Sequence, residues 1–149
     1  MKQLLLICAV VALVGCSPAV KIADPIVEKT IRAKLNKPTG ELTQADLEKV
    51  VNLDLRSNQL TDVTSLEKLT HIEYLVLESN QLTDVTGLEN LTQLTYLSFR
   101  GNRLASVKGL EKLDQLTKLN LLNNPDLTKA QIDQLQKALP KCTIFSDYD

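Results

Sequence analysis

The 149-residue sequence predicts a short α/β solenoid, a stack of coils in which each coil adds one strand to a parallel sheet. The first observation is a set of four asparagines spaced 22 residues apart, at Asn58, Asn80, Asn102 and Asn124. The second is the apolar phrase that precedes each one, as in Leu53-x-Leu55-x-x-Asn58. The third is an apolar spacing of three that follows each of the first three asparagines, as in Leu60, Val63, Leu66, Leu69, Ile72; after Asn124 the pattern breaks at Pro125 and Asp126. A fixed period with this phrase is the signature of leucine-rich repeats.

The Leu-x-Leu part of each phrase predicts a short strand. A period of two directs both leucines to the core and directs their neighbours to the opposite face of the sheet. The asparagine follows where the chain leaves the sheet. Its side-chain amide both donates and accepts, so it can pair backbone groups that would otherwise be buried without partners. We therefore interpret the four asparagines as a structural ladder and not as a ligand site.

The segments after the asparagines predict the convex back of the solenoid. An apolar spacing of three favours tight 3₁₀-like turns over a regular α-helix. Asp62 and Asp84 recur in these segments, and we interpret them as turn or cap residues. A calcium-binding role is the alternative for these two acids.

Two short helices are expected before the first repeat. Asp24 has the features of a helix N-cap, and Pro25 occupies the first helical position, which predicts a helix to about Asn36. A second helix is expected at Thr43, because Asp46 lies three residues later like the acid of a capping box. Such caps cover the core and sheet edge that terminal coils would otherwise expose.

A third helix is expected after the last repeat. Thr128-x-x-Gln131 predicts its start, Ile132 and Leu135 share its apolar face, and Pro140 ends it. Residues 143–145 are a candidate for one more strand. The chain then divides into a signal peptide (1–15), a tether (16–23), an N-terminal helical cap (24–51), the repeats (52–125) and a C-terminal helical cap (126–149).

The N-terminal segment has the pattern of an export signal. A short basic start is followed by the apolar run LLLICAVVALVG, which is too short to span a bilayer as a mature helix. Its end, Leu13-Val14-Gly15-Cys16, resembles the lipobox of bacterial lipoproteins. That resemblance implies a diacylglycerol on the Cys16 thiol and cleavage just before this residue. The alternative is an ordinary signal peptide with an incidental cysteine.

A lipoprotein of this kind is expected to be anchored on a membrane without crossing it. Two or three acyl chains, at ~0.8 kcal/mol per buried CH₂, hold a protein stably. Ser17, the residue after the cysteine, resembles that of lipoproteins sorted to the outer membrane of a Gram-negative host. The expected location is the bacterial cell envelope, either periplasmic or surface-exposed.

The repeats themselves resemble the 22-residue repeats of the bacterial internalins. The two segments that carry the resemblance are LTDVTSLEKLTHIEYLVLESNQ and LTDVTGLENLTQLTYLSFRGNR. The resemblance implies a scaffold that binds proteins.

Composition and motifs argue against several other classes of protein. The 17 basic and 18 acidic residues nearly balance, which gives no reason to expect a nucleic-acid partner. The single histidine, His71, is expected on the surface, and no phosphate-binding glycine loop or Cys/His ligand spacing is present. We therefore predict no enzyme activity, no cofactor and no metal. Cys142 is interpreted as a small buried side chain, with a reactive or intermolecular thiol as the alternative.

The remaining candidate for function is the concave face, which we define as the outward positions of the strands. Parity places three columns of side chains there: Asn52, Tyr74, Tyr96, Lys118; Asp54, Val76, Ser98, Asn120; Arg56, Glu78, Arg100, Leu122. From these we select six candidate partner-binding residues: Tyr74, Val76, Glu78, Tyr96, Ser98, Arg100.

Two features of this face have open alternatives. Tyr74 and Tyr96 are either interface anchors or a pair that packs together and shields the sheet. The alternating charges of Arg56, Glu78 and Arg100 favour a self-neutralising ladder over a site for a charged ligand.

Size limits what this face can bind. Five strands at ~4.8 Å, each about five residues long, give roughly 400 Å², whereas a standard interface needs about 800 Å² per partner. The concave face alone is therefore suited to a weak protein contact, a peptide or a glycan. We predict a monomeric, lipid-anchored envelope protein that presents a protein-interaction surface. The alternative is a structural or inhibitory envelope protein that binds through its convex face or edges.

Overall fold

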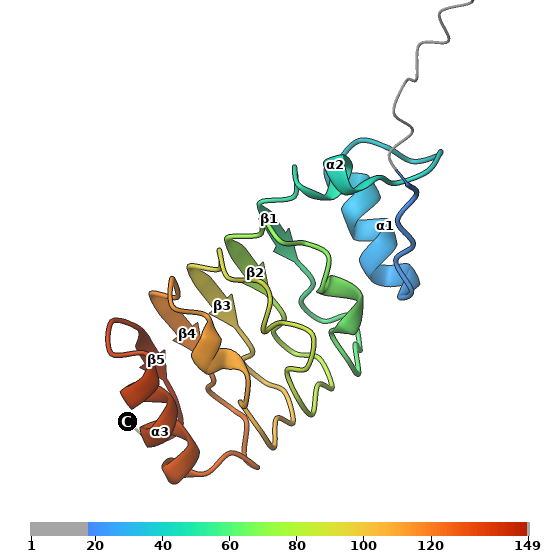
Figure 1. The fold of residues 1–149 in the computed structure, drawn as a ribbon. Helices are drawn as coiled ribbons and strands as arrows, with labels where there is room; N and C mark the ends of the chain where they lie inside the picture. Colours follow the sequence, from blue (N-terminus) through green and yellow to red (C-terminus); the bar gives the residue numbers. More distant parts are fainter. Residues whose placement is uncertain (1–17, 149) are drawn as a thin grey trace, which may run out of the picture.

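The computed structural model describes residues 18–148 and contains a five-stranded parallel sheet in the order β1-β2-β3-β4-β5 (Figure 1). Strands are stacked in chain order, and the connecting turns form the opposite side of the molecule (Figure 1). The strands are β1 (Asn52–Asp54), β2 (Tyr74–Val76), β3 (Tyr96–Ser98), β4 (Lys118–Asn120) and β5 (Thr143–Phe145). The predicted fold class, a short leucine-rich-repeat solenoid, is confirmed.

The strands pair in the register that the repeat predicts. Leu53 lies opposite Leu75, Leu75 opposite Leu97, and Leu97 opposite Leu119. The last step joins Leu119 to Ile144 and is longer, because a helix is inserted between β4 and β5. These central residues are buried in one continuous core that extends from the first helix to the last strand.

The segments after the asparagines form 3₁₀-like turns, as their apolar spacing predicts. Two of them contain 3₁₀ helices, η1 (Thr64–Leu66) and η2 (Leu110–Lys112). In each coil an apolar residue donates its amide to the carbonyl three residues earlier; the Leu66 amide, for example, lies 2.9 Å from the Val63 carbonyl. Each hydrogen bond of this kind links two core positions, which explains why the apolar period is three.

Asp62 and Asp84 act within these turns. The Asp62 carboxylate accepts from the amide of Thr64 at 3.1 Å, and Asp84 accepts from the amide of Thr86 at 2.9 Å. Both acids therefore occupy the turn role that the sequence predicts.

The first helix, α1 (Pro25–Lys34), begins as the sequence predicts. The Asp24 carboxylate accepts from the amides of Ile26 and Val27, at 2.8 and 3.0 Å. The helix ends two residues before the expected Asn36, because Asn36 adopts a left-handed backbone conformation with φ of 50°.

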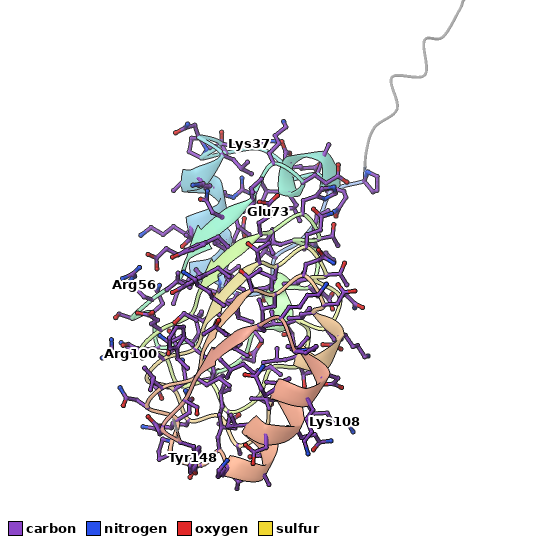
Figure 2. All side chains as sticks on the ribbon, turned by 90° about the vertical axis from the view of Figure 1, so that its left-hand side faces the viewer. Lys37, Arg56, Glu73, Arg100, Lys108 and Tyr148 are labelled. Atoms are coloured by element: carbon purple, nitrogen blue, oxygen red, sulfur yellow. The ribbon has the colours of Figure 1, made fainter. Side chains whose placement is uncertain are left out.

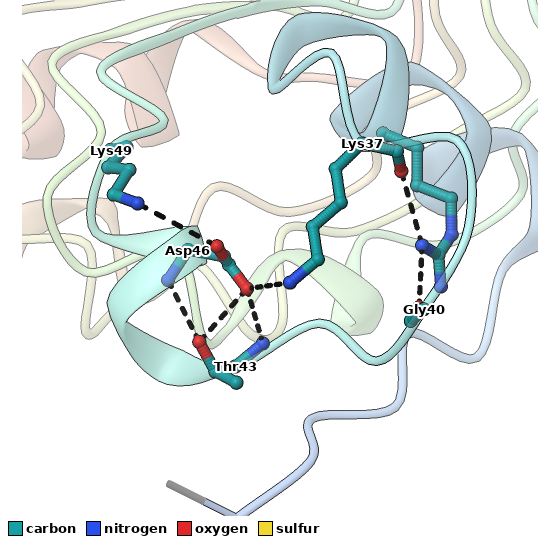
Figure 3. A network of polar contacts seen from close by, with 6 residues as sticks. Lys37, Gly40, Thr43, Asp46 and Lys49 are labelled. Atoms are coloured by element: carbon teal, nitrogen blue, oxygen red, sulfur yellow. Dashed lines mark hydrogen bonds and ion pairs between the residues drawn. The ribbon is translucent and has the colours of Figure 1, made fainter.

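The second helix, α2 (Gln44–Leu47), carries the predicted capping box between Thr43 and Asp46. Figure 3 shows that Asp46 also forms an ion pair with Lys37. The Lys37 Nζ lies 2.7 Å from the Asp46 Oδ2. Hydrogen bonds from Lys37, and then from Thr43, lower the pKa of the Asp46 carboxyl. The ion pair therefore links Lys37, in the segment between α1 and α2, to the first turn of α2.

The C-terminal helix, α3 (Lys129–Ala138), also carries its predicted capping box, between Thr128 and Gln131. It places Ile132 and Leu135 in the core, and β5 then closes the sheet, with Ile144 buried.

Cys142 lies between α3 and β5, and its side chain is 4% exposed. Burial raises the pKa of its thiol to about 11. The environment is that of the small buried side chain predicted from the sequence.

Two predictions about the N-terminus concern residues that are not described. Cys16 and the apolar run before it lie outside residues 18–148. Within the described range, no helix has the length and apolar character needed to cross a bilayer.

Candidate functional site: the concave face

The asparagines that close each coil pair backbone groups of neighbouring coils. The Oδ1 of Asn80 accepts from the amides of Asn58 and Leu60, both at 3.0 Å. Its Nδ2 donates to the carbonyls of Leu55 and Leu77, at 2.9 and 3.0 Å. The side chain is 7% exposed and is directed at its own coil and the preceding one.

The later asparagines repeat this pattern. The Oδ1 of Asn102 accepts from Leu82, and that of Asn124 from Leu104, both at 3.1 Å. The Asp147 carboxylate accepts from the Asn124 amide at 3.3 Å and therefore ends the ladder. Asn58, at the other end, is only half-buried.

Tyr74 and Tyr96 lie opposite each other on β2 and β3 and stack face to face. Their ring centroids are 4.1 Å apart, with an angle of 9° between the ring planes. Tyr74 is 44% exposed, whereas Tyr96 is half-buried. Burial, and then the neighbouring Tyr74 side chain, raise the pKa of the Tyr96 hydroxyl. The pair therefore shields part of the sheet and still exposes aromatic surface.

Val76 and Ser98 were expected on the exposed part of this face, and that expectation is wrong. They lie at the outward register positions of β2 and β3, but they are 2% and 0% exposed. Both are short side chains in the middle column, between two columns of longer side chains, and Ser98 donates a hydrogen bond to one of these, Glu78. A partner on the concave face therefore meets their neighbours and not Val76 or Ser98.

The charged column does not form the alternating ion-pair ladder that the sequence favours. Arg56 instead pairs with Asp54, with distances of 2.8 to 2.9 Å to the carboxylate oxygens. This contact is the main cause of the lowered pKa of the Asp54 carboxyl. Glu78 accepts a hydrogen bond of 2.7 Å from Ser98.

Arg100 is left as an exposed cation, and among the described residues its guanidinium has no hydrogen-bond or ion-pair partner. Figure 2 shows Arg56 and Arg100 along the same margin of the sheet.

Two exposed aromatic residues near the C-terminus are not predicted by the repeat pattern. Phe145, on β5, lies opposite Asn120 of β4 and is 42% exposed. Tyr148 is 44% exposed, and its hydroxyl donates to the Leu127 carbonyl. It lies at the opposite end of the molecule from Lys37 (Figure 2). The alternation in residues 143–145 could have identified Phe145. If the apolar Ile144 points to the core, parity directs Phe145 outward.

His71 is exposed, and its Nδ1 lies 3.3 Å from the hydroxyl of Thr70. Across residues 18–148, no three His, Cys, Asp or Glu side chains are grouped so that they could hold a metal ion.

Comparison with known proteins identifies the repeats. A family model described as leucine-rich repeats in two copies matches residues 48–90 and 92–137. No curated protein matched the sequence.

The chain also resembles solved internalin structures from Listeria monocytogenes. Internalin C2 is 27% identical, with a TM-score of 0.72 over 82% of this chain and 53% of that structure. Internalin inlF is 28% identical, with a TM-score of 0.72 over 82% of this chain and 36% of that structure.

The functional domain of InlJ, a structure said to include a cysteine ladder, is 29% identical, with a TM-score of 0.69 over 82% of this chain and 26% of that domain. The chain thus spans about half or less of the length of the structures it resembles. Together with the match of the family model to more than half of the sequence, these likenesses show that the chain belongs to the leucine-rich-repeat family and resembles the bacterial internalins.

Proposed function

We propose that this protein is lipid-anchored in the bacterial cell envelope and that its concave face binds a protein or peptide. The observation that carries the proposal is the exposed part of the Tyr74 and Tyr96 stack on the concave face. Rigid aromatic side chains of this kind are the usual anchors of protein interfaces. Glu78 and Arg100 lie in the third column of the same face, separated from the stack by the column of Val76 and Ser98, and charges at such a margin set orientation and association rate more than affinity.

The anchor rests on the lipobox-like end of the apolar run, Leu13-Val14-Gly15-Cys16. Cys16→Ser removes the thiol that would carry the diacylglycerol. The variant is expected to lose both the acyl mass and the cleavage before residue 16, and to leave the detergent phase on partitioning. Intact mass spectrometry of wild-type and variant protein from the native host checks this result. Wild-type protein without acyl mass, or cleaved elsewhere, would show that the anchor is misassigned.

The binding proposal is tested by crosslinking in intact cells, with the wild-type protein and with a variant carrying both Tyr74→Ala and Tyr96→Ala. A partner that binds the concave face is recovered with the wild type and is lost or strongly reduced with the variant. A partner recovered equally with both proteins contradicts binding at this face.

One observation favours the alternative, in which the protein is structural or inhibitory and binds through its convex side. A hollow of about 350 Å³ lies between α3 and the η2 turn, and Val107, Lys108, Glu111 and Leu135 are among its lining residues. Lys108→Glu in the same crosslinking experiment distinguishes the two surfaces. Loss of the partner through this change, with no effect of the tyrosine changes, supports the alternative.

A further inference from the structure

A hollow opens at the β1 end of the concave face, beside the tyrosine stack. It has a volume of about 400 Å³ and is lined by Asn52, Leu53, Asp54 and Tyr74. One face of the Tyr74 ring is covered by Tyr96, on the β3 side. The hollow is lined by β1 residues, so it borders the other face of this ring. Its volume lies at the lower end of the range for ligand sites, about 300 to 1,000 Å³.

The polar side chains around this hollow are held in place by contacts outside it. Lys34 donates to the Oδ1 of Asn52, and the NH₂ group of Asn52 has no hydrogen-bond partner among the residues that the structure describes. Arg56 holds the Asp54 carboxylate through two hydrogen bonds from Nε and an ion pair from its terminal nitrogen. Carboxylate oxygens have several acceptor positions, so Asp54 can still accept from a ligand. Side chains fixed in this way lose little conformational freedom on binding.

The hollow therefore combines one free aromatic face with a fixed amide donor and a fixed carboxylate acceptor. An aromatic face carries the negative end of the ring quadrupole and attracts groups with a positive edge, such as the C–H bonds of a sugar ring. Sugar hydroxyls both donate and accept, so they can pair with the Asn52 amide and the Asp54 carboxylate together. We propose that this hollow is a binding subsite for one sugar unit of an uncharged glycan.

Charge and solvation favour a sugar over a protein side chain. Lys34 contacts Asn52 and Arg56 contacts Asp54, so a lysine or arginine from a partner would lie close to two cations, and the carboxylate that could pair with it is already paired with Arg56. A partner carboxylate would lie against Asp54. A purely apolar side chain would remove water from the charged pair without replacing its hydrogen bonds, which is unfavourable. A neutral ligand rich in hydroxyls avoids all three costs.

The test uses the purified full-length protein and three uncharged oligosaccharides, cellotetraose, maltotetraose and chitotetraose. Calorimetry and saturation-transfer NMR measure binding by the wild type and by four variants. At least one oligosaccharide is expected to bind. Tyr74→Ala is expected to weaken its binding by about ten-fold or more, because the stacking face is lost. Asn52→Ala is expected to weaken it several-fold, because an amide donor is lost.

Two variants are matched controls. Tyr74→Phe keeps the ring face and loses only the hydroxyl, so binding is expected to remain. Phe145→Ala removes an exposed aromatic ring three strands away and is expected to leave binding unchanged. Because Tyr74→Ala also removes the stack with Tyr96, its unfolding midpoint is measured. Asn52→Ala provides an independent result if that variant fails to fold.

Three outcomes overturn the proposal. The first is that none of the oligosaccharides binds the wild type at millimolar concentration. The second is that Tyr74→Ala and Asn52→Ala bind the oligosaccharide as tightly as the wild type, or that Phe145→Ala weakens binding as much as Tyr74→Ala does. The third is Tyr74-dependent binding of an arginine-containing peptide without any bound oligosaccharide, which would assign the hollow to a cationic partner. Binding to added sugars does not require the protein partner, so this test and the crosslinking experiment can fail independently.

Discussion

The side chain of Asn80 takes part in five hydrogen bonds, all of them to backbone groups. Replacing it with alanine leaves buried amides and carbonyls without partners. Asn80→Ala is therefore expected to lower the free energy of unfolding by about 1 to 3 kcal/mol. Urea titration measures this change. Asn58→Ala is the matched control and is expected to have a smaller effect, because the Asn58 side chain donates only to the Arg56 carbonyl and is half-buried. An unchanged midpoint for Asn80→Ala would contradict the structural role of the ladder.

The thiol of Cys142 provides a second test for a single residue. Its pKa is raised to about 11 by burial, so very little reactive thiolate is present near pH 8. A thiol reagent is expected to modify the native protein slowly and the urea-unfolded protein rapidly. Mass spectrometry over a time course checks the two rates. Modification of native protein as fast as unfolded protein would favour the reactive-thiol alternative.

The sequence predicts which side of the sheet a residue faces, but not how deeply it is buried there. Tyr74 and Val76 both point outward by parity, yet Tyr74 is 44% exposed and Val76 is 2% exposed. The difference arises from the reach of the neighbouring long side chains, which alternation does not encode. Alternation likewise does not predict that Arg56 pairs with Asp54, two residues earlier at the end of β1.

Among the helices, the capping network of α2 makes stability depend on pH. The pKa of Asp46 is lowered in the folded protein, chiefly by Lys37, so its charged form stabilises the fold above the pKa of the unfolded chain, ~3.9. That contribution is lost as the pH falls through the folded-state pKa. Asp46→Asn is therefore expected to destabilise the protein near neutral pH, and the difference from wild type is expected to shrink in acid.

Urea midpoints of wild type and Asp46→Asn across this pH range measure the effect. Glu48→Gln removes an acid from the C-terminal end of α2 without removing the Lys37 contact, and it is expected to show a smaller difference. A destabilisation by Asp46→Asn that stays constant from neutral to acid pH would contradict the role of the Lys37 contact.

Helix starts could be predicted from the sequence because each depends on residues only three positions apart, such as Thr43 with Asp46 and Thr128 with Gln131. The end of α1 was less predictable, because it depends on the left-handed conformation of Asn36. The length of the last coil depends on the inserted α3, which moves β5 out of the 22-residue period. The exposed Phe145 was missed for that reason.

For the molecule as a whole, most of the fold follows from the sequence because the coils before α3 repeat one pattern of apolar residues and asparagine. The period of the asparagines sets the coil length, and the two apolar spacings set its strand and its turn. The binding surface does not follow in this way, since it depends on the positions that vary between coils. Burial of Val76 and Ser98 reduces the accessible concave face, whereas Phe145 extends it to β5.

The central claim is that the concave face binds a partner through the stacked tyrosines. The most direct measurement is the dissociation constant of a partner isolated by crosslinking, for purified wild type and for the variant with both Tyr74→Ala and Tyr96→Ala. The variant is expected to bind about ten-fold more weakly or worse. Its loss of stability is expected to be modest, about 0.5 to 1.5 kcal/mol from the aromatic pair, plus the cost of uncovering nearby side chains. Equal binding by wild type and a folded variant, with loss of binding in Lys108→Glu, would contradict the claim and place the interface on the convex side.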